Sequence, residues 1–189
     1  MLTTVANLPS HLQNFLLTLL ALIAFAANSV LCRLALGDAA IDAASFTLLR
    51  LFSGAITLAL LVKFSNKDFN WHQLLAPLTL KNWLAPAMLF IYAIFFSFAY
   101  LKLNTATGAL ILFAAVQFFL IGAEMVKGKK LQTLEIIGIV LAFAGFIWLM
   151  LPSASQPSII GLLLMTTAGI AWGVYTLLGK GSTRPLQDT

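Results

Sequence analysis

The stretch Asn104–Lys130, NTATGALILFAAVQFFLIGAEMVKGKK, decides the fold because it contains one membrane span with a direction. Its apolar part, Ala109–Ala123, is interrupted only by Gln117 and Gly122. A helix rises about 1.5 Å per residue, so this part nearly matches the roughly 30 Å hydrocarbon core of a bilayer. A lysine cluster follows the span at positions 127–130. Because lysines that flank a span mark the cytoplasmic side, the pattern predicts that the span runs from outside to inside.

The composition places the rest of the chain in lipid as well. Of 189 residues, 61% are hydrophobic and 9% are charged, whereas a soluble domain has about 25% charged residues. The net charge is +5, but the basic residues flank apolar runs instead of forming one patch, so nucleic acid is not an expected partner. The sequence therefore indicates an integral membrane protein that is embedded in a lipid bilayer and has the bilayer as a partner.

Six apolar segments predict an all-α membrane protein, a bundle of six transmembrane helices, because a helix satisfies its own backbone hydrogen bonds in lipid. The expected spans are Phe15–Leu36, Ala43–Val62, Trp83–Leu101, Thr107–Ala123, Leu134–Leu151 and Ile159–Leu178. The first segment could instead be a signal peptide cleaved near Ala26, but no Lys or Arg precedes it and the apolar run continues to Cys32, which favours a span. The segment Asn66–Asn82 is expected to lie at the membrane interface.

The basic residues are distributed unequally between the two sides of these spans. One side has Lys102, with Arg33 at the rim of the first span. The other side has eight basic residues: Lys63, Lys67, Lys81, Lys127, Lys129, Lys130, Lys180 and Arg184. The pattern predicts a multi-pass protein of the plasma (bacterial inner) membrane with both termini in the cytoplasm.

The sixth span matches the first when it is shifted back by 147 residues. Ile170 then pairs with Ile23, and Trp172 pairs with Phe25. The second copy would begin after five spans, an odd number, so a true repeat would enter the membrane upside down, as in the inverted repeats of transporters. Apolar helices also match one another by chance, and the two explanations are equally open.

Several motifs, in order along residues 15–180, resemble the EamA family of the drug/metabolite transporter superfamily. The motifs that carry the resemblance are Ala26–Ser29 with Arg33–Leu36, Phe46–Leu51, Tyr100–Leu110, Glu124 with the basic turn and Leu134–Gly138, Ala144–Gly145, and Gly161–Lys180. The resemblance implies ten spans in two inverted halves that move small metabolites. It divides the chain into a cytoplasmic segment 1–13, a first repeat 14–152 with five transmembrane helices, and the start of a second repeat, 153–189.

This resemblance implies a secondary transporter, an exporter or carrier of small-molecule metabolites, that works by alternating access. Spans 7–10 of the family pattern are not in the 189 residues. The alternative is therefore a truncated or half-size membrane protein without transport activity of its own, which associates as a homodimer or with a complementary half. The sequence itself has no nucleotide-binding loop, metal-binding motif or catalytic triad, so no enzyme activity, cofactor or metal is expected.

Arg50 is the most informative single residue, because the apolar run that follows it is too short to span a membrane. The helix must begin near Ala43, which places Arg50 about 10 Å inside it. A charge at that depth is costly and needs a cavity or a partner. Two interpretations are open: contact with an anion or carboxylate in a substrate path, or pairing with Asp42 or Asp38 at the rim.

The other substrate-cavity candidates are polar or aromatic residues inside spans. They are Asn28, Ser29, Tyr92, Tyr100, Gln117, Trp172 and Tyr175. Under the repeat hypothesis, Asn28 and Ser29 face Trp172 and Tyr175 across a cavity; the alternative for all four is packing and lipid contact. Gln117 is expected either to hold helices together or to line the cavity. Glu124 is the candidate for proton coupling, although an ion pair with Lys127 or Lys129 at the membrane edge is the preferred interpretation.

Overall fold

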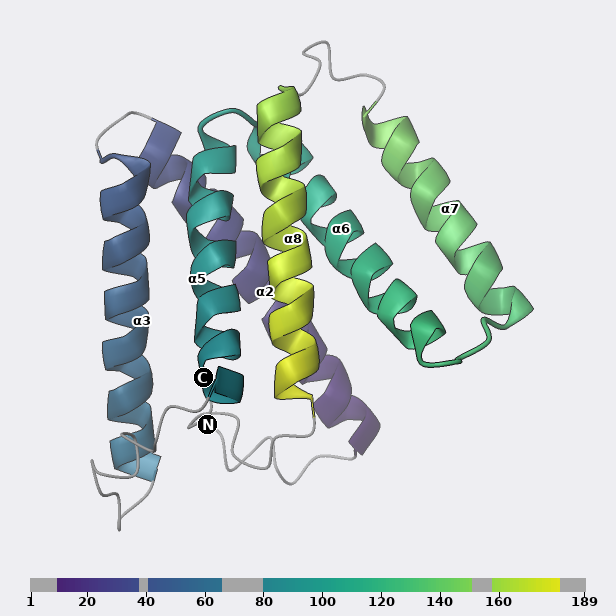
Figure 1. Cartoon of the computed structure of the whole chain (residues 1–189), viewed down its shortest axis with the longest axis horizontal. Coiled ribbons are helices and arrows are strands. Elements are labelled where there is room, and N and C mark those ends of the chain that lie inside the picture. The colour runs from purple at the N-terminus through teal and green to yellow at the C-terminus, as the bar shows by residue number, and fades with distance from the viewer. Residues whose placement is uncertain (1–9, 38–40, 66–79, 151–157, 181–189) are drawn as a thin grey trace.

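The computed structural model describes residues 10–37, 41–65, 80–150 and 158–180, and this part of the chain consists of six helices without a strand (Figure 1). The helices are α2 (Ser10–Gly37), α3 (Ala43–Ser65), α5 (Leu80–Tyr100), α6 (Thr105–Val126), α7 (Thr133–Met150) and α8 (Ile159–Gly179). Five of them are long and apolar enough to cross a membrane; the apolar part of α7, Thr133–Trp148, is shorter. The all-α membrane fold is confirmed. The interfacial segment expected at 66–82 lies largely outside the described residues.

Three helices begin at polar side chains that accept hydrogen bonds from backbone amides of the first turn. Asn104 accepts from the Thr107 amide at 2.8 Å, and Ser158 accepts from the Gly161 amide at 3.4 Å. The Asp42 carboxylate accepts from the amides of Ala44 and Ser45. Such caps satisfy amides that have no partner within the helix, so these polar residues determine where α6, α8 and α3 begin.

Successive helices run in opposite directions, and the start of α2, the α6–α7 turn and the end of α8 lie at the same end of the bundle (Figure 1). Lysines follow or end three helices there: Lys63 on α3, Lys127 and Lys129 after α6, and Lys180 after α8. Lys63, Lys127, Lys129 and Lys180, which the sequence assigns to one side, therefore lie at one end of the bundle.

The core of the bundle forms where α5 and α6 pack against α8. Gly169 of α8 lies so close to α6 that an added Cβ would be 2.6 Å from the Ala115 Cβ and 2.9 Å from the Leu112 carbonyl oxygen. Gly173 lies equally close to the Phe119 ring. Small residues allow this approach between membrane helices, where contact energy depends on close packing. The small-residue surface of α8 is thus used inside the bundle.

Candidate functional site

Arg50 points from α3 toward α5, into the bundle. Its Nη2 donates a hydrogen bond of 3.3 Å to the Tyr92 hydroxyl. Its guanidinium carbon lies 5.3 Å from the centre of the Tyr92 ring and 5.0 Å from the centre of the Phe96 ring. On the α2 side, Cys32 is buried and close enough to interact with the charge of Arg50. Arg50 is therefore held by rings and a hydroxyl, without pairing to Asp42, whose carboxylate caps α3. Asp38, the other expected partner, lies outside the described residues.

One nitrogen of Arg50, Nη1, is buried and has no hydrogen-bond partner among the described residues. A charged residue at the centre of a membrane helix costs about 2.5–3.5 kcal/mol on insertion scales. A cation over an aromatic ring gains about 0.5–2 kcal/mol, so the two rings offset much of that cost. They do not replace the missing hydrogen-bond acceptor, because a buried donor without a partner is itself destabilising.

Thr47 and Ser97, which lie near Arg50 in the contact between α3 and α5, have partners for their hydroxyl groups. One turn before Arg50, the Thr47 hydroxyl lies 2.8 Å from the Ser97 hydroxyl of α5. Each of these hydroxyls also lies within hydrogen-bond distance of the carbonyl oxygen four residues earlier, of Ala43 and of Ala93 respectively. Thr47 and Ser97 are both buried. The α3–α5 seam thus pairs its hydroxyls and leaves one guanidinium nitrogen unpaired.

An aromatic cluster continues from Arg50 toward α8. The Trp172 ring lies 4.7 Å from the Tyr92 ring and 5.5 Å from the Tyr175 ring, measured between ring centres. Phe25 of α2 meets Trp172 edge to face at 6.1 Å. Four predicted site residues, Arg50, Tyr92, Trp172 and Tyr175, are therefore linked by direct contacts from three helices.

Phe96 and Phe25 belong to the same cluster, although the sequence did not single them out as site residues. Phe96 is fully buried, and its ring lies against the Arg50 guanidinium. Its position four residues after Tyr92 could have indicated this, since residues at that spacing share a helix face. Phe25 could have been found from the internal match, which pairs it with Trp172.

Other predicted candidates have different surroundings. Ser29 is buried and Asn28 is half-buried on α2. Tyr100 is fully buried at the end of α5, where its hydroxyl donates to the Thr105 carbonyl oxygen at 3.5 Å. The Arg33 Nη1 donates to the Tyr100 carbonyl oxygen at 3.0 Å. Tyr100 therefore closes the corner between α5 and α6.

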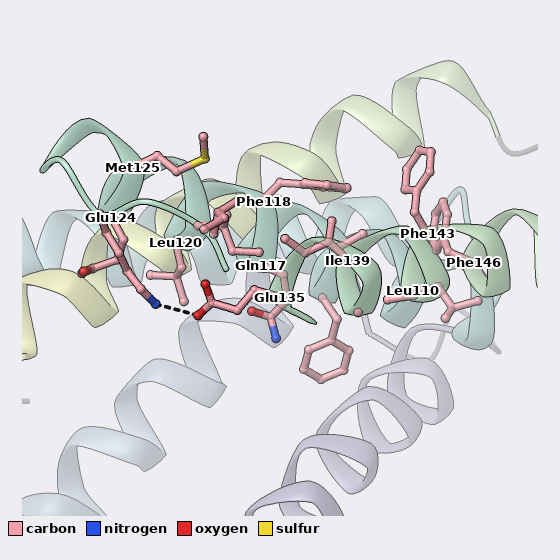
Figure 2. A pocket seen from close by; sticks show the side chains of 17 residues that line it. Leu110, Gln117, Phe118, Leu120, Glu124, Met125, Glu135, Ile139, Phe143 and Phe146 are labelled. Atoms are coloured by element: carbon pink, nitrogen blue, oxygen red, sulfur yellow. Dashed lines mark hydrogen bonds and ion pairs between the residues drawn. The ribbon is translucent and has the colours of Figure 1, made fainter. Parts of the chain in front are cut away.

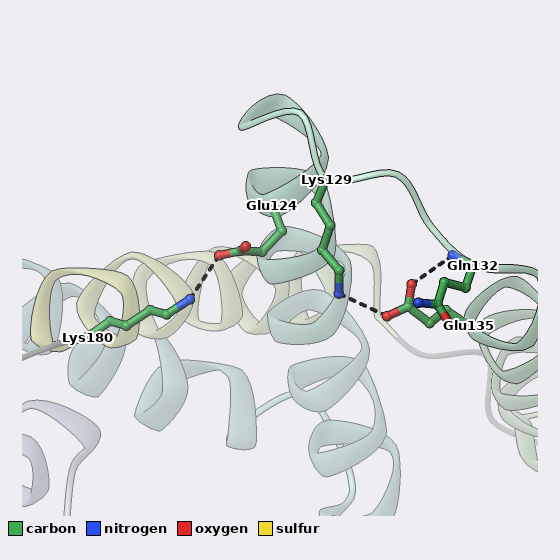
Figure 3. A network of polar contacts seen from close by, with 5 residues as sticks. All are labelled: Glu124, Lys129, Gln132, Glu135 and Lys180. Atoms are coloured by element: carbon green, nitrogen blue, oxygen red, sulfur yellow. Dashed lines mark hydrogen bonds and ion pairs between the residues drawn. The ribbon is translucent and has the colours of Figure 1, made fainter.

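Glu124 lies at the other end of the bundle, at the end of α6 (Figure 3). Its carboxylate is 3.2 Å from the Lys180 ammonium after α8 and 3.6 Å from the Lys127 ammonium. Nearby, the Lys129 ammonium lies 2.9 Å from the Glu135 carboxylate, whose hydrogen bond and charge raise the pKa of Lys129. The expected pairing of Glu124 with Lys127 is present, whereas Lys129 pairs with Glu135. The contact that links α6 to α8 is the one with Lys180, which the sequence did not predict.

Gln117 lies away from the Arg50 contacts, in a groove of about 610 Å³ between α6 and α7 (Figure 2). Phe118 and Phe143 also line this groove, and both are largely exposed. The groove is mostly apolar and carries charge only toward its Glu124–Lys129–Glu135 end. We place the candidate site at Arg50 and not in this groove. Arg50 offers a buried charged donor without a partner, whereas the groove is wider but mostly apolar.

No metal centre is indicated in the described part of the chain, where no three His, Cys, Asp or Glu residues lie together. The single Cys32 is a buried free thiol. At Arg50 a cation with an unpartnered N–H donor lies beside aromatic faces, an arrangement that suits an anionic group joined to an apolar body.

Two curated relatives are similar to this chain. The uncharacterized protein PA1977 of Pseudomonas aeruginosa is 48% identical over 174 residues, which cover 92% of this chain and 58% of that protein. An uncharacterized transporter of Archaeoglobus fulgidus is 36% identical over 89 residues, which cover 45% of this chain and 30% of that protein. The chain thus spans less than two thirds of the length of either relative. No family model and no solved structure matches it.

These comparisons and the fold support the same general class. The chain is a multi-pass membrane protein with lipid-facing apolar helices. Its partial similarity to a transporter favours a transporter-like membrane protein.

Proposed function

We propose that the chain is an integral membrane secondary transporter that moves small metabolites by alternating access, with Arg50 in the substrate path. The observation that carries the proposal is the buried, unpartnered Nη1 of Arg50 beside the Tyr92–Trp172 aromatic contact. Ionisable groups inside membrane spans are costly and commonly belong to substrate or ion pathways. The partial similarity to the Archaeoglobus transporter supports the same class.

The inverted-repeat part of the proposal is supported by the contact between Phe25 and Trp172. These two residues occupy matching positions when α8 is shifted onto α2, and their rings touch at 6.1 Å. Residues that contact their own symmetry mates lie next to a two-fold axis. α2 and α8 run in opposite directions, as an inverted repeat requires (Figure 1). This supports membership of the EamA family. The lysines at one end of the bundle support the further proposal that both termini lie in the cytoplasm, with the protein in the inner membrane.

Glu124 is the proposed coupling group. When its carboxylate is ionised, it attracts Lys180 across the α6–α8 contact. Protonation would remove that attraction and loosen the two helices at this end, which is the kind of switch that proton-coupled transport requires. Uptake driven by a pH gradient should then be lost in Glu124→Gln while uptake driven by substrate concentration alone persists.

Transport by the purified chain in proteoliposomes tests the carrier proposal. A panel of labelled amino acids and organic acids should include at least one that shows saturable uptake. Arg50→Gln should reduce this uptake at least about tenfold, since a site that loses a buried charged donor discriminates strongly. Arg33→Gln is the matched control, because Arg33 donates to the Tyr100 carbonyl oxygen at the bundle rim. A folded chain that takes up none of the panel would contradict independent transport.

The alternative is a half-size protein that transports only after association with a second copy or a complementary half. The open groove between α6 and α7 favours it, because Phe118 and Phe143 remain exposed although their rings meet edge to face. Mass measurement in detergent distinguishes the two proposals: a monomer that is active in vesicles supports the independent carrier. A dimer whose activity disappears on dilution supports the alternative.

A further inference from the structure

We infer that the Arg50 site takes a singly charged carboxylate joined to a planar aromatic ring. The inference rests on the proposed function and names the substrate class for its site. The juxtaposition that carries it is one unpartnered guanidinium nitrogen on a group that lies over the Tyr92 and Phe96 rings, with the Trp172 ring packed against Tyr92.

The charge argument begins with the acidic residues of the described part of the chain. Asp42 caps α3, Glu124 pairs with Lys180 and Lys127, and Glu135 pairs with Lys129. None of these carboxylates contacts Arg50. The positive charge inside the bundle is therefore not balanced by a described acid, and an anionic ligand supplies the missing charge and the missing acceptor together.

The number of charges favours a carboxylate over a phosphate ester. Arg50 is one cation, and the Nη1 of Arg33 is directed to the Tyr100 carbonyl oxygen at the rim. Lys102 is exposed beyond the end of α5. A phosphate monoester carries close to two negative charges near neutral pH, so a single arginine would leave part of its charge unpaired in a site of low polarity. A monocarboxylate matches the single guanidinium.

The aromatic rings define the rest of the ligand. Tyr92 and Trp172 are tilted by 51° at 4.7 Å, and Trp172 and Tyr175 are tilted by 37° at 5.5 Å. Aromatic rings favour offset and edge contacts with one another, so we infer that the bound ligand packs a ring of its own against these rings. Alternating access opens and closes seams between helices. The Arg50 Nη1 donor, which is covered in one state of the transport cycle, is thus reached by the ligand in another state.

Trp172 also provides the measurement, because it contacts Tyr92 in the site. The full chain with Trp71→Phe, Trp83→Phe and Trp148→Phe retains Trp172 as its sole tryptophan fluorophore. This protein is titrated in lipid nanodiscs with phenylacetate and three comparison compounds. Phenylacetamide lacks the negative charge, acetate lacks the aromatic ring, and phenyl phosphate has a phosphate in place of the carboxylate. Phenylacetate should change the fluorescence saturably and bind at least about tenfold more tightly than the other three.

Comparing these four ligands on the protein that carries only the three Trp→Phe substitutions tests the inference without an Arg50 variant. Phenylacetamide or acetate binding within about twofold of phenylacetate would overturn it, and so would the absence of saturable phenylacetate binding. Tighter binding of phenyl phosphate would overturn the assignment to a carboxylate. A supporting series compares Arg50→Lys and Arg50→Gln with Arg33→Gln; only the Arg50 variants should weaken binding, with far-UV circular dichroism reporting whether each variant folds.

Failure of this inference is distinguishable from failure of the carrier proposal. Phenylacetate binding through Arg50 with no uptake of any probe supports the substrate class and contradicts independent transport. Saturable uptake of metabolites that lack a carboxylate, unaffected by Arg50→Gln, supports the carrier and overturns the inference.

Discussion

α7 and α8 are both apolar helices that contain glycines, yet the two helices pack in opposite ways. In α8, an added Cβ on Gly169 or Gly173 would collide with α6. In α7, an added Cβ on Gly138 or Gly145 would meet nothing within 4 Å. Lipid tails are as apolar as the side chains, so apolarity brings a helix into the membrane without choosing its neighbour. The difference teaches that complementary surfaces determine which helices form the core.

The largest expected effect comes from replacing a core aromatic residue. Phe96→Ala removes a fully buried ring from α5, whereas Phe143→Ala removes an exposed ring from α7. A buried Phe→Ala costs about 3–5 kcal/mol in soluble proteins; in lipid the transfer part is missing, so we expect about 2 kcal/mol for Phe96. SDS-driven unfolding in mixed micelles measures both variants. Equal losses would contradict the distinction between core and periphery.

The glycines give a second test with the same substitution on both helices. Gly169→Ala places a Cβ against the backbone of α6 and should destabilise the chain by about 1–3 kcal/mol, as overpacking does. Gly138→Ala should leave stability unchanged or raise it by up to about 1 kcal/mol, since alanine favours helix where space is open. The measurement is again the free energy of unfolding in SDS. A destabilised Gly138→Ala variant would show that α7 is packed against something.

Removing an ion pair should lower the melting temperature by a smaller amount, and this amount should depend on salt concentration. Glu124→Gln removes the attraction to Lys180 that joins α6 to α8, and Glu135→Gln removes the contact to Lys129 at the start of α7. These groups are exposed, so the expected shifts in apparent melting temperature are slight and vanish at high salt. A large, salt-independent shift in either variant would indicate that water is excluded from that end of the bundle.

The smallest effect concerns the start of α3 and depends on pH. Hydrogen bonds from Ser45 and then Ala44 hold the pKa of the Asp42 carboxyl below its usual range. The cap is thus fully present above the unfolded pKa of about 3.9 and is lost as the pH falls through the lower folded value. Asp42→Asn keeps an acceptor that does not titrate. The melting temperature of the unaltered chain should fall slightly more on acidification than that of Asp42→Asn; identical curves would contradict the cap.

Much of the fold was predictable because lipid imposes simple rules. The six helices occupy the expected apolar segments, with ends that differ from the expected ones by a few residues. Arg50 required α3 to begin near Ala43, and α3 begins there. The N-cap at Asn104 begins α6 at Thr105, before the expected Thr107.

The candidate site was predictable only in part. Arg50, Tyr92, Trp172 and Tyr175 were all candidates, but the sequence did not indicate that α3 and α8 meet α5 on adjacent sides of Tyr92. Gln117 was equally reasonable as a candidate from its depth, and it lies in the α6–α7 groove instead. Depth follows from counting residues along a helix; the direction in which a side chain faces depends on which helix is its neighbour.

The sequence alone determined that this chain inserts into a lipid bilayer. It also determined which residues form the helices and which helix ends carry the lysines. These properties follow from the cost of exposing backbone and charge to hydrocarbon, which each segment experiences separately. Only the tertiary structure decided that α8 packs into the core while α7 does not, and that Arg50 is left with an unpaired nitrogen among aromatic rings. Those outcomes depend on the fit between surfaces far apart in the chain, because helix contacts in a membrane gain their energy from close packing.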